Sequence, residues 1–130
     1  MNNNNEWHLT LVQYWWSKAE ESLYSAMREF KAESYNFAMN RIYYSAFYGV
    51  RSLFFKKGLS FKKHSGVRSA FHREFIKTGL VEIKYGKFYD QLFEDRQEGD
   101  YIAFVSFEPD YVEYQLKRSA EFLDILRPMI

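Results

Sequence analysis

The residues best suited to chemistry on a phosphate lie in one basic segment, residues 51–73. This segment holds seven lysines or arginines, two histidines and no acid, although the whole chain has a formal net charge of only +1. At the expected start of a helix it places five residues in a row: Lys62, Lys63, His64, Ser65 and Gly66. A helix start offers free backbone N–H groups and a positive dipole end, which favour an anion. Spacing alone, however, favours a solvated loop with Ser65 as an ordinary N-cap over a ligand site.

Arg68 and His72 are one helical turn apart on the same face of that helix. Together they could contact one phosphate, or His72 could act as an acid or base near neutral pH. Spacing alone favours the simpler interpretation, an exposed polar pair. The three histidines, His8, His64 and His72, show no metal-ligand spacing and no acid cluster beside them, so we expect neither a metal nor a cofactor.

Residues 96–101 (Arg-Gln-Glu-Gly-Asp-Tyr) indicate a helix end followed by a tight turn. Between residues 94 and 110 the chain holds six acids, against which Arg96 is the single basic residue. Without other information, Arg96 is expected to form an ion pair with Asp100 or Glu94. No arrangement along the chain is typical of a Ser/His/Asp or Cys/His nucleophile system.

The segment 36–55 is expected to form a helix that neighbouring helices enclose on every side. One side carries apolar residues at helical spacing, the opposite side carries a second stripe, and small residues lie between the two. The polar part of the second stripe consists of Asn40, Arg41, Tyr44, Tyr48 and Arg51. We rank a dimer face, or internal contacts that position other helices, above a nucleotide site in which rings stack on bases and arginines hold phosphate.

Periodicity predicts five helices, at about residues 9–31, 36–57, 65–77, 85–98 and 109–127, and no strand. In the first helix, Leu9 and Met27 are expected on the core face. Gly58 is the expected C-terminal cap of the second helix, and Pro109 opens the fifth. Residues 101–107 are interpreted as an ordered connection. The predicted fold is all-α, an antiparallel four-helix up-and-down bundle with an additional short helix.

The length of 130 residues and the 21% aromatic content are consistent with one domain that has a substantial core. We assign residues 9–130 to that domain and expect residues 1–8 to be a frayed or disordered terminus. The absence of cysteine excludes disulfides and thiol nucleophiles. No apolar run is long enough to span a membrane and the polar start is not typical of a signal peptide, so we expect a soluble, cytoplasmic protein.

Each of these features is weak by itself, but their order along the chain resembles a known family. The order begins with residues 40–47 (Asn-Arg-Ile-Tyr-Tyr-Ser-Ala-Phe) and continues with 63–66 (Lys-His-Ser-Gly), 78–80 (Thr-Gly-Leu) and then Arg96, Asp100 and Tyr101. It ends with residues 120–122 (Ala-Glu-Phe) of the last expected helix. Over nearly the whole chain, this pattern resembles the HEPN domain family (higher eukaryotes and prokaryotes nucleotide-binding), in its small stand-alone prokaryotic branch.

The resemblance implies a bundle of four long helices and a shorter one, usually paired as a homodimer, often beside a minimal nucleotidyltransferase in a toxin–antitoxin pair. It also implies, for many members, metal-independent endoribonuclease activity from an Arg-x(4–6)-His motif that faces its copy across the dimer. Here Tyr101 stands where that histidine would follow Arg96. A tyrosine with an ordinary pKa near 10 is poorly suited to move protons at neutral pH. Under the family analogy, Tyr101 would instead accept a nucleotidyl group.

We therefore expect a nucleotide- or RNA-binding HEPN module that acts with a nucleotidyltransferase and lacks the standard ribonuclease motif. Its expected binding residues are Lys62, Lys63, His64, Ser65, Arg68, His72 and Arg96. In the alternative, the chain is a metal-independent endoribonuclease toxin in which His64 or His72 replaces the motif histidine. The catalytic candidates are then Arg96, Tyr101 and His64. In a third interpretation the chain is a structural interaction protein, and its arginines only connect helices.

Overall fold

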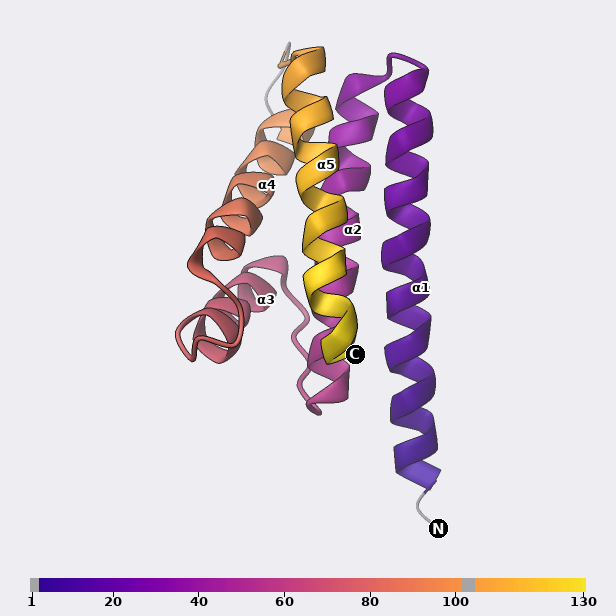
Figure 1. Ribbon diagram of the computed structural model, residues 1–130, viewed down its shortest axis with the longest axis vertical. Helices are drawn as coiled ribbons and strands as arrows, with labels where there is room; N and C mark the ends of the chain where they lie inside the picture. Colours follow the sequence, from indigo (N-terminus) through magenta and orange to yellow (C-terminus); the bar gives the residue numbers. More distant parts are fainter. Residues whose placement is uncertain (1–2, 102–104) are drawn as a thin grey trace.

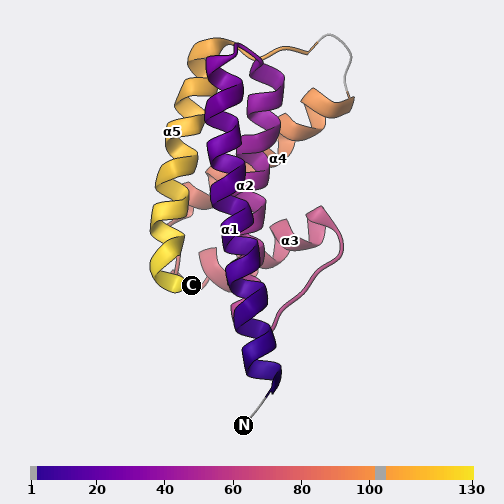
Figure 2. The ribbon, with the colours of Figure 1, turned by 90° about the vertical axis from the view of Figure 1, so that its right-hand side faces the viewer.

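Four long helices run alternately up and down, and a short helix lies across them (Figures 1 and 2). The computed structural model describes residues 3–101 and 105–130, without the side chains of residues 3–5 and 101. The helices are α1 (Asn3–Lys31), α2 (Tyr35–Lys56), α3 (His64–Phe71), α4 (Ile83–Tyr101) and α5 (Pro109–Leu126), with a π-helical turn at His72–Ile76 and a 3-10 turn at Arg127–Met129. No strand occurs in these described ranges. The predicted all-α bundle is confirmed.

Helices α1 and α2 form a long antiparallel hairpin, and serine side chains form hydrogen bonds between the two helices. Ser22 Oγ donates to the carbonyl oxygen of Arg41 at 2.8 Å, and Ser52 Oγ donates to that of Val12 at 2.6 Å. The helix α1 begins at Asn3, six residues before the predicted start, and its first turns extend beyond the end of α5 (Figure 1). Leu9 is therefore 58% exposed, and the prediction that it faces the core is wrong, as it is for Met27, which is 42% exposed.

Helix α2 provides the centre of the core. Helices α1, α4 and α5 pack around it (Figure 2). Large aromatic side chains fill the interior between α2, α3, α4 and α5. The fully buried aromatic residues are Tyr43, Phe54, Phe71, Phe75, Tyr89 and Phe122. At Gly49 a Cβ atom would lie 3.0 Å from Leu123 Cδ2, so this glycine allows α5 to approach α2 closely.

One side of α2 is not covered within a single chain. Arg41 and Phe37 are exposed, and Tyr44, Tyr48 and Arg51 are only partly buried. The prediction that neighbouring helices enclose α2 on every side is therefore wrong. The reason is physical: tyrosine and arginine carry long apolar parts that can pack on a surface while their polar ends stay in water, so an aromatic stripe does not require full burial.

Two glycines with positive φ set the reversals on either side of the short helix. Gly58 (φ 75°) follows α2, as predicted, and Gly79 (φ 78°) follows the π-helical turn. A left-handed backbone favours glycine because other residues lose stability there. These turns place α3 across the bundle, with its first residue against α2 and its last turns against α4.

The connection to α5 lies partly outside the described residues. Residues 105–108 form neither helix nor strand, and Asn36 Nδ2 donates to the carbonyl oxygen of Val105 at 2.9 Å. Residues 102–104, which belong to the predicted ordered connection, lie outside the description, while Tyr101 is the last residue of α4. Among the described helices, none has the length and apolar character needed to cross a membrane.

Candidate functional site

His64, the first residue of α3, packs on the middle of α2. Its Nδ1 lies 2.8 Å from the hydroxyl oxygen of Tyr43. The imidazole ring stacks on Phe47, with ring centroids 4.3 Å apart and planes 6° from parallel. The ring of Tyr44 lies nearly perpendicular to the imidazole, with centroids 5.9 Å apart. Three aromatic side chains of α2 therefore fix both the position and the plane of this histidine.

Arg96 reaches the same place from α4. Its guanidinium carbon lies 5.2 Å from the ring centroid of Tyr43 and 5.5 Å from that of Tyr44, distances typical of cation–π contacts. The side chain is 15% exposed, and its Nε lies 3.4 Å from Asp100 Oδ2. The predicted ion pair with Asp100 is confirmed, but its geometry does not make a hydrogen bond, and the buried Nε has no hydrogen-bond partner among the described residues.

A second arginine, Arg51 of α2, lies against aromatic rings close to His64. Its guanidinium carbon is 4.4 Å from the ring centroid of Trp15, 5.7 Å from that of Phe55 and 6.0 Å from that of Phe47. These rings hold the guanidinium near the histidine that stacks on the same Phe47. We call His64, Tyr43, Tyr44, Phe47, Arg51 and Arg96 the His64 cluster.

The electrostatics of the His64 cluster keep the histidine neutral and the tyrosine protonated. Burial lowers the pKa of His64 below its ordinary value of 6.5, and the positive charges of Arg96 and Arg51 lower it further. Burial raises the pKa of Tyr43 to about 12, against an opposing effect of Arg96. At neutral pH, His64 is therefore an uncharged imidazole with one N–H and one lone pair.

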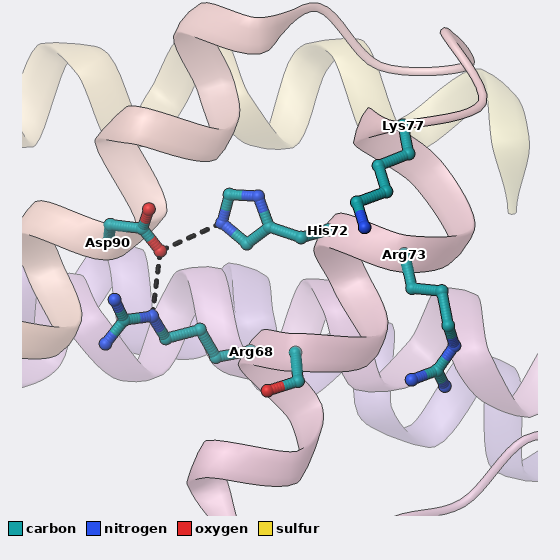
Figure 3. Close-up of a pocket in the computed structure, with 6 residues that line it drawn as sticks. Arg68, His72, Arg73, Lys77 and Asp90 are labelled. Carbon is teal, nitrogen blue, oxygen red and sulfur yellow. Dashed lines mark hydrogen bonds and ion pairs between the residues drawn. The ribbon is translucent and has the colours of Figure 1, made fainter.

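A second constellation lies beside the first, where the π-helical turn meets α4 (Figure 3). Asp90 Oδ1 accepts from Arg68 Nε at 2.9 Å and from His72 Nε2 at 2.9 Å. The three side chains are only 31–32% exposed. They line a pocket of about 460 Å³ whose lining residues are Arg68, Ser69, His72, Arg73, Lys77 and Asp90.

Gly86 of α4 makes room for the imidazole of His72. A Cβ atom at this position would lie 2.9 Å from His72 Cε1 and 3.1 Å from Ile76 Cγ1. The absence of a side chain at residue 86 therefore lets the π-helical turn approach the backbone of α4. π-helical turns are often found at functional sites, and this one places His72 beside α4.

The structure brings together some of the predicted residues. His64 and Arg96 both contact the ring of Tyr44 although they are 32 positions apart in the chain (96 minus 64). Tyr44 and Arg51 of the predicted polar stripe belong to the same cluster. The interpretation of Arg68 and His72 as an exposed polar pair is wrong, because both are largely buried and share one carboxylate.

Other predicted residues lie apart from these two constellations. Lys62, Lys63 and Ser65 are exposed around the start of α3, and Ser65 is not an N-cap because the helix begins one residue before it, with Lys63 in the capping position. Arg41 Nη1 donates to Asn40 Oδ1 at 3.2 Å. Arg41 also lines a groove between α1 and α2, and Tyr48 of the predicted stripe lines the same groove.

The side chain of Tyr101 lies outside the described residues. Its predicted role stays a prediction. In the described part of the chain, no group of three or more His, Asp or Glu side chains is arranged to hold a metal ion.

Three residues of these constellations, Tyr43, Phe47 and Asp90, were not among the predicted site residues. Tyr43 appeared as one aromatic residue of an apolar stripe, and only its hydroxyl group distinguished it from its neighbours. Asp90 lies in the segment predicted to form the fourth helix, but it was not singled out from the sequence. Its spacing from Phe93 places both on one helix face, which was the available signal, but the sequence does not show which helix packs against that face.

The fold and these two constellations define an all-α bundle protein with histidine and arginine side chains gathered where a short cross helix meets the bundle. The HEPN domain model matches residues 12–129, so the chain belongs to the HEPN domain family. A UPF0332 protein of Thermotoga maritima is 46% identical over 120 residues, which cover 92% of this chain and 91% of that protein. A Methanocaldococcus jannaschii protein named "Putative toxin MJ0142" is 38% identical over 107 residues, which cover 82% of this chain and 73% of that protein.

Proposed function

We propose that this chain is the RNA- or nucleotide-binding component of a toxin–antitoxin pair, and that its partner is a nucleotidyltransferase. The membership of the HEPN family and the toxin names of two relatives support a toxin-like module. The observation that carries the binding proposal is the meeting of His64 and Arg96 on the aromatic surface of α2.

The cluster has the chemistry that a phosphodiester requires. Arg96 supplies a fixed positive charge, and the exposed Lys62 and Lys63 add positive charge at the start of α3, where an RNA strand would approach. When Tyr43 donates its O–H to His64 Nδ1, the proton of the neutral imidazole lies on Nε2, which can then donate to a phosphate oxygen. The partly exposed ring of Tyr44 offers a surface on which a base would stack.

We further propose that two copies of the chain associate through the uncovered side of α2. This side carries Arg41, Tyr44, Tyr48 and Arg51, which are exposed or partly buried in a single chain. Tyrosine and arginine are enriched in the centres of protein interfaces. Association there would bring two His64 clusters close to each other, because Tyr44 and Arg51 belong to both the stripe and the cluster.

Fluorescence titration of a labelled single-stranded RNA tests the binding proposal. We expect affinity to fall steeply as salt rises, because each neutralised phosphate releases counterions. Arg96→Ala should lower affinity about tenfold or more and reduce the slope with salt, whereas Lys117→Ala, on the exposed side of α5, should leave both unchanged. Circular dichroism establishes that both variants fold. Equal affinity of the wild type and folded Arg96→Ala would overturn the proposal.

A second candidate function, metal-independent cleavage of RNA, is favoured by the neutral state of His64. In the other tautomer, Nδ1–H donates to the oxygen of Tyr43 and Nε2 carries the lone pair. Nε2 would take the proton of a ribose 2′-hydroxyl while the 2′-oxygen bonds to phosphorus and the bond from phosphorus to the 5′-oxygen breaks. The leaving oxygen takes a proton from water, and Arg96 would stabilise the charge on the phosphoryl oxygens.

Cleavage of RNA by the purified protein in excess chelator tests this candidate. The expected products are a 2′,3′-cyclic phosphate and a 5′-hydroxyl, with loss of at least two orders of magnitude in rate for His64→Ala and for Arg96→Ala. His8→Ala, at the exposed start of α1, is the control for a lost histidine. If cleavage persists at the wild-type rate in His64→Ala, this candidate is wrong.

A further inference from the structure

We infer that the pocket between the π-helical turn and α4 binds a second phosphate group of the RNA strand that is held at the His64 cluster. This inference rests on the proposed function. It adds a specific site with its own residues, Arg68, His72, Arg73 and Lys77, and it predicts which RNA molecules bind most tightly.

The pocket has an excess of positive charge with a single carboxylate. Arg68, Arg73 and Lys77 are cationic, and Asp90 is the only acid among the six lining residues. That carboxylate already accepts hydrogen bonds from both Arg68 and His72, so its negative charge has partners within the pocket lining. Ser69 adds an exposed hydroxyl to the lining. An anion with several acceptor oxygens, such as a phosphate, matches this set of donors.

Arg68 is held in place before any ligand arrives. Its Nε donates to Asp90 Oδ1 at 2.9 Å, and its guanidinium carbon lies 4.7 Å from the ring centroid of Phe93. Among the described residues, its two terminal nitrogens have no hydrogen-bond partner. The guanidinium therefore loses little freedom on binding and presents a planar edge that suits phosphate oxygens.

Arg73 and Lys77 form the opposite part of the pocket. Figure 3 shows His72 between Asp90 on one side and the two longer cations on the other. Arg73 is 55% exposed and its one ion pair in the described structure, with Glu74, is at 3.4 Å. Lys77 is exposed. Both side chains are long enough to close over an anion that Arg68 and His72 receive.

A chain of side-chain contacts through Phe93 joins the pocket to the His64 cluster. Arg68 stacks on Phe93, Phe93 contacts Tyr43 with centroids 6.4 Å apart, and Arg96 stacks on that same Tyr43. His64 and Arg68 are four positions apart, a rise of about 6 Å along a helix. An extended strand running along α3 would thus place successive phosphates near the two constellations in turn.

Binding of short RNAs by wild type and by the double variant Arg73→Ala/Lys77→Ala tests the inference. The probes are ApA, with one phosphodiester, and three RNAs with a second phosphate: pApA, ApAp and ApApA. We expect at least one of the three to bind wild type about tenfold more tightly than ApA does. The double variant should lose this gain and bind ApA unchanged. The control Lys84→Ala/Lys87→Ala, on exposed positions of α4, should keep it.

Each outcome is decisive. A gain with pApA or ApAp alone would mean that the pocket takes a terminal phosphate, and a gain with ApApA would mean that it takes an internal one; either supports the inference. If all four RNAs bind wild type equally, or if the double variant keeps the full gain, the inference is overturned while the proposed function stands. If no RNA binds, the proposed function fails and this inference fails with it.

Discussion

The hydroxyl oxygen of Tyr43 lies 2.8 Å from Nδ1 of His64, and this contact joins the centre of α2 to the first residue of α3. Tyr43 is completely buried, and its pKa is raised to about 12, so it keeps its proton at any physiological pH. The position of the histidine is therefore determined by the core of the bundle. A histidine held in this way can present one ring nitrogen to a ligand in a constant direction.

Replacing Tyr43 with phenylalanine should separate the packing role of the ring from the role of its hydroxyl. We expect a folded protein that is less stable by about 1 kcal/mol, the usual net value of one hydrogen bond. RNA affinity should fall as well, because Nδ1 of His64 loses the hydrogen-bond partner that orients the imidazole. Chemical denaturation measures the first effect and RNA titration the second. Unchanged stability together with unchanged affinity would show that the hydrogen bond has no role.

The lowered pKa of His64 predicts a stability that depends on pH. The unfolded chain, with an ordinary histidine pKa of about 6.5, takes up a proton at a higher pH than the folded chain does. As the pH falls from 6.5 towards the lower pKa of His64 in the folded state, unfolding is therefore favoured. Above pH 6.5 the contribution of His64 to stability is complete. Melting temperatures at pH 7.5 and pH 5.5 test this.

His64→Gln removes the titrating group and should show a smaller loss of melting temperature on acidification than wild type. His8→Gln, at an exposed position of α1, is the matched control and should behave as wild type. If wild type and His64→Gln lose the same melting temperature between the two pH values, the histidine is not titrating in the predicted direction.

Asp90 is predicted to matter for stability because it accepts hydrogen bonds from two other elements, from Arg68 of α3 and from His72 of the π-helical turn. Asp90→Ala leaves Arg68 and His72 without their shared acceptor, and we expect a loss of about 1–2 kcal/mol, since the three side chains are only partly exposed. Asp90→Asn keeps one acceptor oxygen and should recover part of this loss. Urea denaturation of the three proteins gives the values. Equal stability of wild type and Asp90→Ala would contradict this description of the contact.

Much of the fold could be predicted from local signals. Gly58 and Pro109 mark the end of one helix and the start of another, and the structure places both as expected. The start of α1 was less predictable. Its polar first residues and the exposed Trp7 carry no pattern of burial, because those turns extend beyond the rest of the bundle.

The site was harder to predict than the fold, because its contacts join residues far apart in the chain. Helical spacing shows that Arg68 and His72 share a face, but not that Asp90 of α4 packs against it. In the same way, nothing local indicates that His64 and Arg96 both contact Tyr43 of α2. The π-helical turn adds to the difficulty, since it changes the helical register just where His72 must turn towards α4.

A last prediction concerns the contact between α2 and α5, which supports the helix that carries Tyr43. Ser45 Oγ donates to the carbonyl oxygen of Ile42 at 2.7 Å and accepts from Ser119 Oγ at 2.6 Å, and both serines are completely buried. Ser45→Ala leaves the hydroxyl of Ser119 buried without its partner, which should cost about 1–3 kcal/mol.

The double variant Ser45→Ala/Ser119→Ala removes both hydroxyls, so no polar group of the pair stays unpaired. It should therefore be less destabilised than the sum of the two single variants, with a coupling of about 1 kcal/mol or more between the positions. Urea denaturation of all four proteins completes the cycle. Strict additivity would mean that the two serines do not bond to each other in solution. A measured coupling would show that α2 and α5 are joined by a polar contact inside an otherwise aromatic and aliphatic core.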